Sequence, residues 1–444
     1  MMDRRAVAVA NAARGDLIDR VGADRVWIGA AARDLCGLPE DRDPIAVVRP
    51  TNTAQVRLLL KIARSRHLPV VARSGLPAVL PDELVGTVVV DTRGLDRPPA
   101  TDISRRLVTV GAGVPVQAID RAARQARLCL RGVPALRGDE TIGALLGAGV
   151  SGEIGLGDGS LLADLVSAQV VAGNGRDLQV GHAALLTSVP WRSEGLPDPA
   201  GLLIGAAGRL AILCEVTLRL HAAPWVAWSV RTGKTGREQV LMVMSAARLA
   251  ISKRAVDTVL VEEGARGRVA VRAATWRGEA DVAAVTALAT EAFARHRVTL
   301  GEWSAEDRRV RLGHAQGDWP EAGASRGATF ELRCSWPDAL KVLDVSDALL
   351  ASAEGPASRV SRSWAFGADY VSVRHRFKGP GSERHPLITG VRHLFDAGAV
   401  PVGLGGALRT IGRERMGPTS KVLLTGLSRA WDPDGVLGNP SGLV

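Results

Sequence analysis

The chain has 444 residues, of which 46% are hydrophobic and 23% charged, and a formal net charge of +10. This length allows two or three domains with cores of their own, and the composition is that of an ordinary globular protein. The four cysteines form no CxxC pair, so neither a disulfide framework nor a thiolate zinc site is indicated. There is no signal-like N-terminus and no apolar run of the roughly 20 residues that a membrane span needs. We therefore expect a cytoplasmic protein with free thiols.

The positive net charge raises the question of nucleic-acid binding. The 56 lysine and arginine residues are spread along the chain, and one tyrosine and five phenylalanines leave little for base stacking. We expect no nucleic-acid partner and no membrane span. Some of the arginines can instead line an active site and attract an anionic small-molecule substrate.

The first predicted elements alternate between strands and helices. A helical lead-in is expected over residues 1–42, and a strand over 46–50 ends at Pro50. Thr51 or Thr53 is expected to cap a helix over 53–66, whose apolar residues recur at helical spacing. Further strands are expected at 69–75, 87–91, 107–114, 164–175, 205–212 and 215–220, with a helix at 118–126. Continuous Val, Ile and Leu runs in these strands indicate a sheet that is covered by helices.

After Pro224 the pattern changes to half-polar strands between longer helices. The strands are predicted at 227–230, 257–261, 268–272, 328–334 and 369–376. The helices are predicted at 238–251, 279–295 and 337–353. This alternation favours an antiparallel sheet covered by helices on one side.

Two glycine motifs fit nucleotide-binding spacings only in part. Gly147–Gly152 has the G-x-G-x-x-G spacing, but the glycine-rich residues 153–159 that follow cannot continue as a helix. Gly111-Ala112-Gly113 lies between a strand and a helix, but it lacks a third glycine and an acidic residue about 20 positions later. Neither motif predicts an NAD site.

The order of elements from residue 46 to 220 resembles the FAD-binding domain of the vanillyl-alcohol-oxidase / p-cresol-methylhydroxylase superfamily. The tail segment Trp431–Pro440 is similar to the closing pattern F-D-P-x-G-I-L-N-P, with Trp in place of Phe and an extra Gly438. The resemblance implies an α+β fold, in which a PCMH-type FAD-binding domain of two α/β subdomains carries a cap domain with an antiparallel sheet covered by helices. It divides the chain into a lead-in (1–42), the FAD-binding domain (43–223), the cap (224–395) and a returning segment (396–444).

The same resemblance implies which residues contact FAD. The turn after the second strand would hold the pyrophosphate, but it contains a single glycine, Gly75, and Pro77 has no N–H to donate. Arg73 either compensates by direct charge contact or is a surface arginine after a strand. No histidine lies between His67 and His182, and no cysteine lies at 137–140, so FAD is expected to bind non-covalently. The implied cofactor contacts are Arg73, Ser74, Gly75, Leu76, Pro77, Pro134, Thr141, Ile142, Gly143, Gly208, Ile212 and Asn439.

Within the superfamily, the tail and cap resemble the group of D-lactate dehydrogenases, glycolate oxidase and alkylglycerone-phosphate synthase. Members that use a metal carry H-x-G-D-G-N-x-H-P and S-G-E-H-G-I-G motifs. Here His375 and His385-Pro386 are what remains of the first motif, and the Glu-His pair is missing from residues 403–412. A complete metal shell is therefore not expected.

The candidate catalytic residues are His375, Arg374, Arg376 and Arg409. Strand alternation places Arg374 and Arg376 on one face and His375 on the other, beside Val371 and Val373. His375 is either a buried structural residue or a base that faces the flavin. The two arginines on the strand either clamp a carboxylate or phosphate or form the solvent face of the strand.

We expect an FAD-dependent oxidoreductase that transfers hydride from an alcohol, sugar or hydroxy acid to flavin N5 without a metal. Its substrate would be anionic or polyhydroxylated. The alternative is a flavin-fold protein that has lost redox function and serves a redox-neutral reaction or an oxidase complex. Both a homodimer and a subunit of such a complex stay open.

Overall fold

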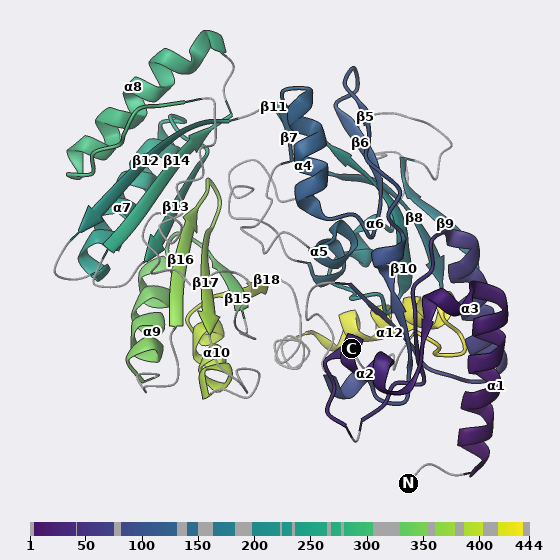
Figure 1. Ribbon diagram of the computed structural model, residues 1–444. Helices are drawn as coiled ribbons and strands as arrows, with labels where there is room; N and C mark the ends of the chain where they lie inside the picture. Colours follow the sequence, from purple (N-terminus) through teal and green to yellow (C-terminus); the bar gives the residue numbers. More distant parts are fainter. Residues whose placement is uncertain are drawn as a thin grey trace.

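The computed structural model describes residues 4–40, 42–74, 81–130, 140–149, 163–182, 198–222, 224–232, 236–263, 268–276, 279–304, 329–352, 360–377, 386–402 and 416–437. Its elements form two lobes (Figure 1). The first lobe contains two sheets, and the second contains one larger sheet with its helices. This agrees with the predicted α+β class.

The first sheet of the first lobe has the order β1-β2-β4-β3. Strands β2 (Ala46–Val48), β4 (Val88–Asp91) and β3 (Val70–Arg73) run parallel, and the short β1 (Val26–Trp27) pairs antiparallel with β2. Helices α1 (Arg4–Val21), α2 (Gly29–Cys36) and α3 (Thr53–Ser65) accompany this sheet. The lead-in therefore contains a strand that its helical pattern did not predict.

Helix α3 confirms the predicted apolar stripe, because the side chains that recur at helical spacing are buried. Its N-cap, however, was predicted wrongly. The capping residue is Asn52, whose side chain accepts a hydrogen bond from the Gln55 backbone N–H, rather than Thr51 or Thr53. Thr51 lies next to the cap and contacts the Gln55 side chain instead.

The second sheet of the first lobe has the order β5-β6-β10-β8-β9 and is antiparallel throughout. Its strands are β5 (Ala100–Asp102), β6 (Leu107–Gly111), β8 (Leu165–Ala172), β9 (Asp177–Gly181) and β10 (Ala211–Arg219). Helices α4 (Val116–Gln125), α5 (Ile142–Ala148) and α6 (Ala200–Leu203) pack in its core. A further pair, β7 (Leu128–Cys129) with β11 (His221–Ala222), leads toward the second lobe.

The second lobe, called the cap below, is a seven-stranded antiparallel sheet of order β12-β14-β13-β16-β17-β15-β18. The strands are β12 (Trp225–Thr232), β13 (Thr258–Glu263), β14 (Arg268–Thr275), β15 (Thr329–Cys334), β16 (Val360–Phe366), β17 (Val371–Phe377) and β18 (Val400–Val402). Its helices are α7 (Gly236–Ser252), α8 (Glu279–Arg295), α9 (Ala339–Ser352) and α10 (Pro386–Asp396). The predicted antiparallel sheet is confirmed, although β16 and β18 were missed.

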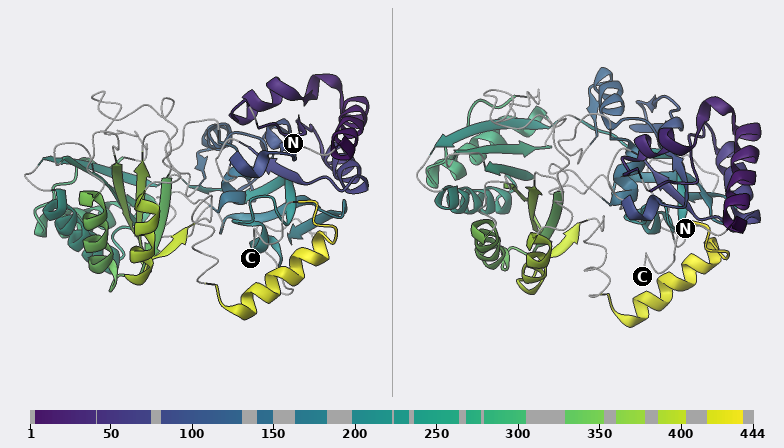
Figure 2. Two further views of the ribbon diagram at one scale, coloured as in Figure 1. Left: turned by 90° about the horizontal axis from the view of Figure 1, so that it is seen from below. Right: turned by 60° about the horizontal axis from the view of Figure 1, so that its bottom comes forward.

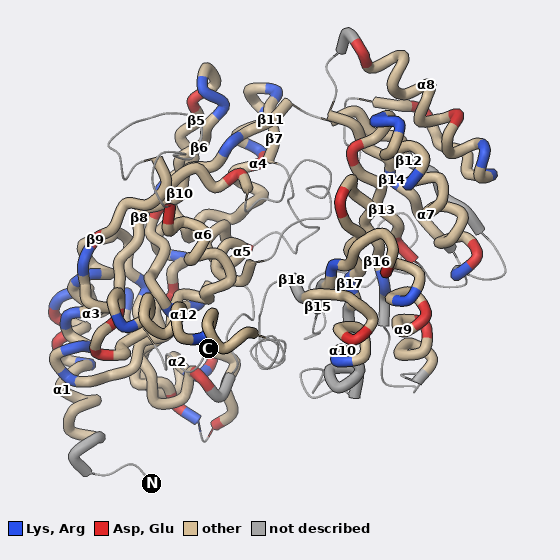
Figure 3. Tube along the Cα trace, turned by 180° about the vertical axis from the view of Figure 1, so that it is seen from behind, with Lys and Arg blue, Asp and Glu red and all other residues tan. Residues whose placement is uncertain are grey.

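Helices α7, α8 and α9 lie on the side of the cap sheet that points away from the first lobe (Figures 1 and 3). One face of the sheet packs with these helices into a single hydrophobic core that includes Val261, Val271 and Val373. The other face, which we call the inner face, lies on the side of the first lobe. Blue and red residues are interspersed over both lobes in Figure 3 rather than gathered by sign.

The C-terminal segment returns to the first lobe, where α12 (Pro418–Trp431) runs beside it (Figure 2). The Val70 backbone N–H donates to the Val436 carbonyl at 2.7 Å, and Val436 and Leu437 join the core around β3. The Asp432 carboxylate accepts hydrogen bonds from the backbone N–H groups of Val436 and Leu437. These contacts attach the tail next to the strand from which the predicted pyrophosphate turn begins.

Candidate functional site

Three segments to which the resemblance assigned FAD contacts meet between the two sheets of the first lobe. At the end of β3, the Ser74 hydroxyl lies 2.8 Å from the Thr141 hydroxyl, and both side chains are buried. Thr141 also caps α5 by accepting from the Ala144 N–H. The turn at Gly208 lies against β3, since a Cβ added at Gly208 would stand 2.7 Å from Ala72 Cβ. Residues distant in sequence are thus brought together here.

The glycines at this junction are of two kinds, those that allow close packing and those with free space beside them. A Cβ at Gly143 would stand 2.8 Å from the Ala112 carbonyl oxygen, so Gly143 lets α5 approach the strand region of the second sheet. Gly208 has a φ of +76° and lets its turn approach β3. At Gly147 and Gly205 an added Cβ would meet nothing closer than 3.8 Å. The junction is therefore tightly packed toward the strands, and there is room for a Cβ at Gly147 in α5 and at Gly205 in the turn after α6.

Arg73 lies at the carboxyl end of β3 but reaches toward α2. Its guanidinium donates to the Leu35 carbonyl at 3.1 Å and lies near Cys36. Burial raises the pKa of the Cys36 thiol, and the Arg73 charge partly counteracts this. The contact of Arg73 with a pyrophosphate stays a prediction. In this arrangement the guanidinium would donate both to the pyrophosphate and to the Leu35 carbonyl.

The described residues at the junction fit a bound dinucleotide. Their donors are hydroxyl groups and the guanidinium groups of Arg73 and Arg209, which suit an anion. The Arg209 Nε atom is buried and makes no hydrogen bond to any described residue, which is the pattern expected where an acceptor is contributed from outside the chain. Ile142 and Ile212 are fully or nearly fully buried core residues, so they would contact a cofactor through their backbone. The predicted contacts Gly75, Leu76, Pro77, Pro134 and Asn439 lie outside the described residues.

The inner face of the cap sheet carries several arginines. Strand pairing aligns Arg272, Leu260, Ala365, Ser372 and Arg333 in one row across five strands. A second row aligns Glu262, Ser363 and Arg374 with Glu331. Residues directly opposite in an antiparallel pair share a face. The inner face therefore carries Arg272, Arg333 and Arg374. Glu262 and Glu331 stand in the same row as Arg374, and strands β13 and β16 separate Arg272 from Arg374.

These arginines are unusual because they are largely shielded from solvent. Arg272 and Arg374 are 3% and 7% exposed, and Arg333 is half-buried with its guanidinium 4.6 Å above the Tyr370 ring. Buried arginines concentrate positive charge at a place where water competes weakly. Of the other predicted residues, only the backbone of Arg376 is described, and Arg409 lies outside the described residues.

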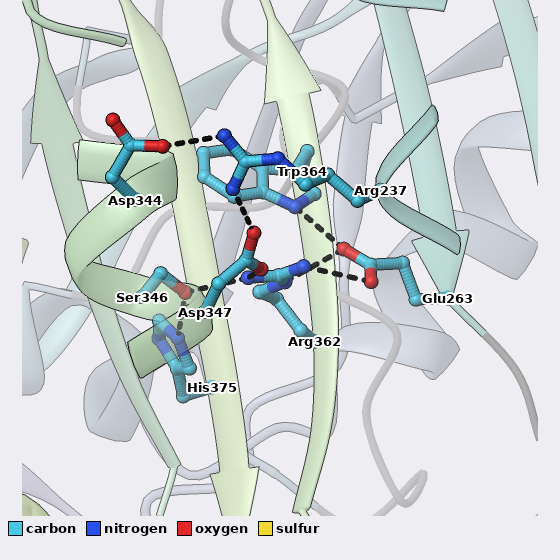
Figure 4. Close-up of polar contacts among 8 residues, drawn as sticks. All are labelled: Arg237, Glu263, Asp344, Ser346, Asp347, Arg362, Trp364 and His375. Carbon is cyan, nitrogen blue, oxygen red and sulfur yellow. Dashed lines mark hydrogen bonds and ion pairs between the residues drawn. The ribbon is translucent and has the colours of Figure 1, made fainter. Parts of the chain in front are cut away.

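His375 points the other way, toward the helices. It is fully buried, and its Nε2 lies 2.7 Å from the Ser346 hydroxyl of α9 (Figure 4). Burial lowers the pKa of His375 to about 3, and the Arg362 charge adds to this effect. Of the two interpretations that the sequence left open, this environment matches a neutral structural histidine.

His375 belongs to a polar network on the helix-covered face (Figure 4). Arg362 donates to both Glu263 oxygens at 2.6 and 2.9 Å, to Asp347 at 2.7 Å and to the Ser346 hydroxyl at 2.9 Å. Glu263 also accepts from the Trp364 indole at 2.7 Å. Because Arg362 donates to Ser346, the Ser346 hydroxyl is free to donate to His375 Nε2. The network therefore joins three strands to α9.

Sequence reasoning had not selected Arg272 or Arg209. A usable signal existed for Arg272, since strand alternation in residues 268–272 places it opposite the face of Val269 and Val271. Arg209 offered no such signal, because it lies in a turn, and the sequence does not show which residues contact that turn in space. Among the described residues, no three His, Cys, Asp or Glu side chains come together as a metal site.

Part of the first lobe matches a known family model. Residues 44–181 match the family model "FAD binding domain". A D-2-hydroxyglutarate dehydrogenase from Xanthomonas citri pv. viticola is 27% identical over 184 residues, which are 41% of this chain and 38% of that protein. A D-lactate dehydrogenase from Archaeoglobus fulgidus is 26% identical over 186 residues, 41% of this chain and 40% of that protein. The chain thus aligns with about two fifths of the length of these curated relatives.

Solved structures match almost the whole chain at low identity. A 4-ethylphenol oxidase from Gulosibacter chungangensis, solved with isoeugenol, has a TM-score of 0.78 at 14% identity, covering 99% of this chain and 98% of that one. p-Cresol methylhydroxylase with bound substrate has a TM-score of 0.74 at 14% identity, covering 98% and 97%. Alkyldihydroxyacetonephosphate synthase has a TM-score of 0.68 at 13% identity, covering 98% and 85%. In the described part of the chain, no helix combines the length and apolar character of a membrane span.

Proposed function

We propose that this chain, which has the FAD-binding domain and the fold of the p-cresol-methylhydroxylase superfamily, is an FAD-dependent oxidoreductase acting on a small hydroxy acid. The observation that carries the proposal is the inner face of the cap sheet. It holds Arg272, Arg333 and Arg374 opposite a lobe that matches an FAD-binding domain. The dehydrogenases of hydroxy acids among the relatives support the same substrate class.

In the proposed reaction, the residues of the chain bind and orient the substrate. Arg374, assisted by Arg272 or Arg333, binds the substrate carboxylate, because a planar guanidinium can hold both carboxylate oxygens. Shielding of these arginines from water strengthens the ion pair and fixes which substrate carbon faces the other lobe. A bound FAD would supply the hydride acceptor for that carbon, and the proton of the substrate hydroxyl would be released to solvent. His375 is given a structural role, since its ring lies on the opposite face of the sheet.

The first test is whether the purified protein is yellow, which would show that it carries a flavin. We expect acid precipitation to release FAD into the supernatant, because no histidine lies between His67 and His182 and no cysteine lies at residues 137–140, where covalent attachment would be expected. Flavin that stays with the precipitate would contradict non-covalent binding. Colourless protein that cannot take up FAD would favour the alternative, a protein that kept the fold without redox function.

The second test addresses the substrate class. Under anaerobic conditions, a panel of 2-hydroxy acids is mixed with the protein, and each acid is paired with its methyl ester. We expect an active acid to bleach the flavin and its ester to fail, because the ester removes the charge that the arginines bind. Equal bleaching by acid and ester would exclude carboxylate recognition by this face.

The third test addresses metals. We expect the reaction to continue after EDTA treatment, since the Glu-His pair of metal-using relatives is missing from residues 403–412. Loss of activity with FAD still bound, and recovery on adding a divalent metal, would show that the reaction needs a metal after all.

A further inference from the structure

A buried arginine in the first lobe has one unsatisfied donor. Arg209 belongs to the turn between α6 and β10, and its side chain is 11% exposed. It forms an ion pair with Glu83, in the short helix of residues 81–84 that leads into β4. The Arg209 Nε atom is buried and has no hydrogen-bond partner among the described residues. A buried N–H without an acceptor is rare in folded proteins, so this atom calls for an explanation.

The position of Arg209 suggests what the acceptor is. Its neighbour Gly208 packs against Ala72 of β3, one residue before Arg73 and two before Ser74. Arg209 therefore lies beside the end of β3, where the resemblance places the pyrophosphate. In the sequence, the segment after β3 contains one glycine, Gly75, and one proline, Pro77, where the superfamily typically has several glycines, so fewer main-chain donors are expected from it. A guanidinium can replace such donors, because it binds phosphate oxygens through two parallel hydrogen bonds.

We propose that Arg209 is a direct ligand of the FAD pyrophosphate and that Glu83 positions its guanidinium. The ion pair fixes one edge of the guanidinium and leaves the donor at Nε for the cofactor. Glu83 itself carries a negative charge next to the bound anion, so its contribution to affinity is opposite in sign to that of Arg209. This inference rests on the proposed binding of FAD, but not on the proposed oxidation reaction.

The experiment measures the dissociation constants of FAD and of ADP, which contains the pyrophosphate without the flavin, for apoprotein variants. We expect Arg209→Met to weaken the binding of both ligands at least tenfold. Glu83→Gln should bind both as tightly as the wild type or more tightly, because a negative charge near the phosphates is removed. The matched control is Arg57→Met, which breaks the exposed ion pair of Arg57 with Asp177 in the same lobe and should leave both constants unchanged.

Two outcomes would overturn the inference. If the ion pair only stabilises the fold, Arg209→Met and Glu83→Gln would lower the melting temperature alike and leave both dissociation constants unchanged. If Arg209→Met does not fold, the dissociation constants of Arg209→Lys test the inference instead. Lysine keeps the positive charge but not the two parallel N–H donors of arginine, so FAD binding must weaken. An unchanged dissociation constant for FAD would overturn the inference. Failure of the wild type to bind FAD would instead refute the proposed function itself.

Discussion

The two faces of the cap sheet use arginine for different purposes. On the helix-covered face, Arg362 is 3% exposed and its guanidinium is bonded to Glu263, Asp347 and Ser346. On the inner face, Arg272 and Arg374 are equally buried but sit in cross-strand rows where Arg333 also projects. One arginine joins strands and a helix inside a core, while the others lie on the face toward the first lobe, where Glu262 and Glu331 share the row of Arg374.

The difference teaches that burial of a charged residue does not by itself indicate function. A buried arginine with carboxylates on two sides is a structural device, whose desolvation is offset by its ion pairs. In the rows of the inner face, arginines outnumber the glutamates Glu262 and Glu331, and this excess of positive charge suits an anionic ligand. His375 and Arg374 are neighbours in sequence, yet the pleat of β17 assigns them to these two different environments.

The largest expected effect comes from Arg362→Met. Removing the guanidinium leaves Glu263 as a mostly buried carboxylate without its ion pair, which typically lowers the free energy of unfolding by about 3–5 kcal/mol. Urea unfolding of the variant measures this loss. The affinity of the folded protein for FAD should stay at the wild-type value. A variant with wild-type stability that no longer binds FAD would show that Arg362 has no structural role.

Arg374→Ala tests the inner face. Removing one partner of a buried charge pair costs about 2–5 kcal/mol in binding, so the KM for the hydroxy acid should rise more than tenfold. Steady-state kinetics and urea unfolding on the same preparations make the comparison. An unchanged KM would show that the substrate does not bind at Arg374.

His375→Gln should change how stability depends on pH. The pKa of His375 is lowered to about 3 in the folded protein, whereas an unfolded histidine titrates near its ordinary value of about 6.5. Below that ordinary value the unfolded state takes up a proton that the folded state does not, so stability falls as the pH decreases from there toward the folded pKa. The slope for one proton is about 1.4 kcal/mol per pH unit.

The measurement is the unfolding free energy of wild type and variant at neutral pH and in the mildly acidic range. The variant should lose less stability on acidification, although it is less stable at neutral pH because Ser346 loses one of its two hydrogen-bond partners. Identical slopes would mean that His375 is protonated in the folded state, contrary to its buried position.

The smallest effect is expected for Tyr370→Leu. The Tyr370 ring lies under the Arg333 guanidinium at 4.6 Å, and such a contact contributes about 0.5–1 kcal/mol when it is partly exposed. We expect a rise of KM of a few fold with little change in stability. If the KM is unchanged while stability falls by several kcal/mol, Tyr370 belongs to the structural part of the cap.

Most of the fold could be predicted from local patterns. The helix of residues 279–295 was predicted with its final boundaries, and the apolar spacing in α3 identified its buried side. Short elements escaped, among them β1 and β18, because two or three residues carry no periodicity. β16 was missed because the polar run Ser361-Arg362-Ser363 interrupts the alternation of polar and apolar residues that is typical of a half-buried strand.

The sequence by itself determined most of the longer helices and strands and the FAD-binding resemblance. It also determined the opposite orientation of Arg374 and His375, since side-chain alternation is a local property of a strand. Only the tertiary structure decided which face of the cap sheet the helices cover, and therefore that His375 lies in a core. It also decided that Asn52 caps α3 and that Arg209 meets Glu83 across 126 residues of chain. Such contacts depend on how the sheets and helices pack, and packing brings together residues that are far apart in sequence and share no local pattern.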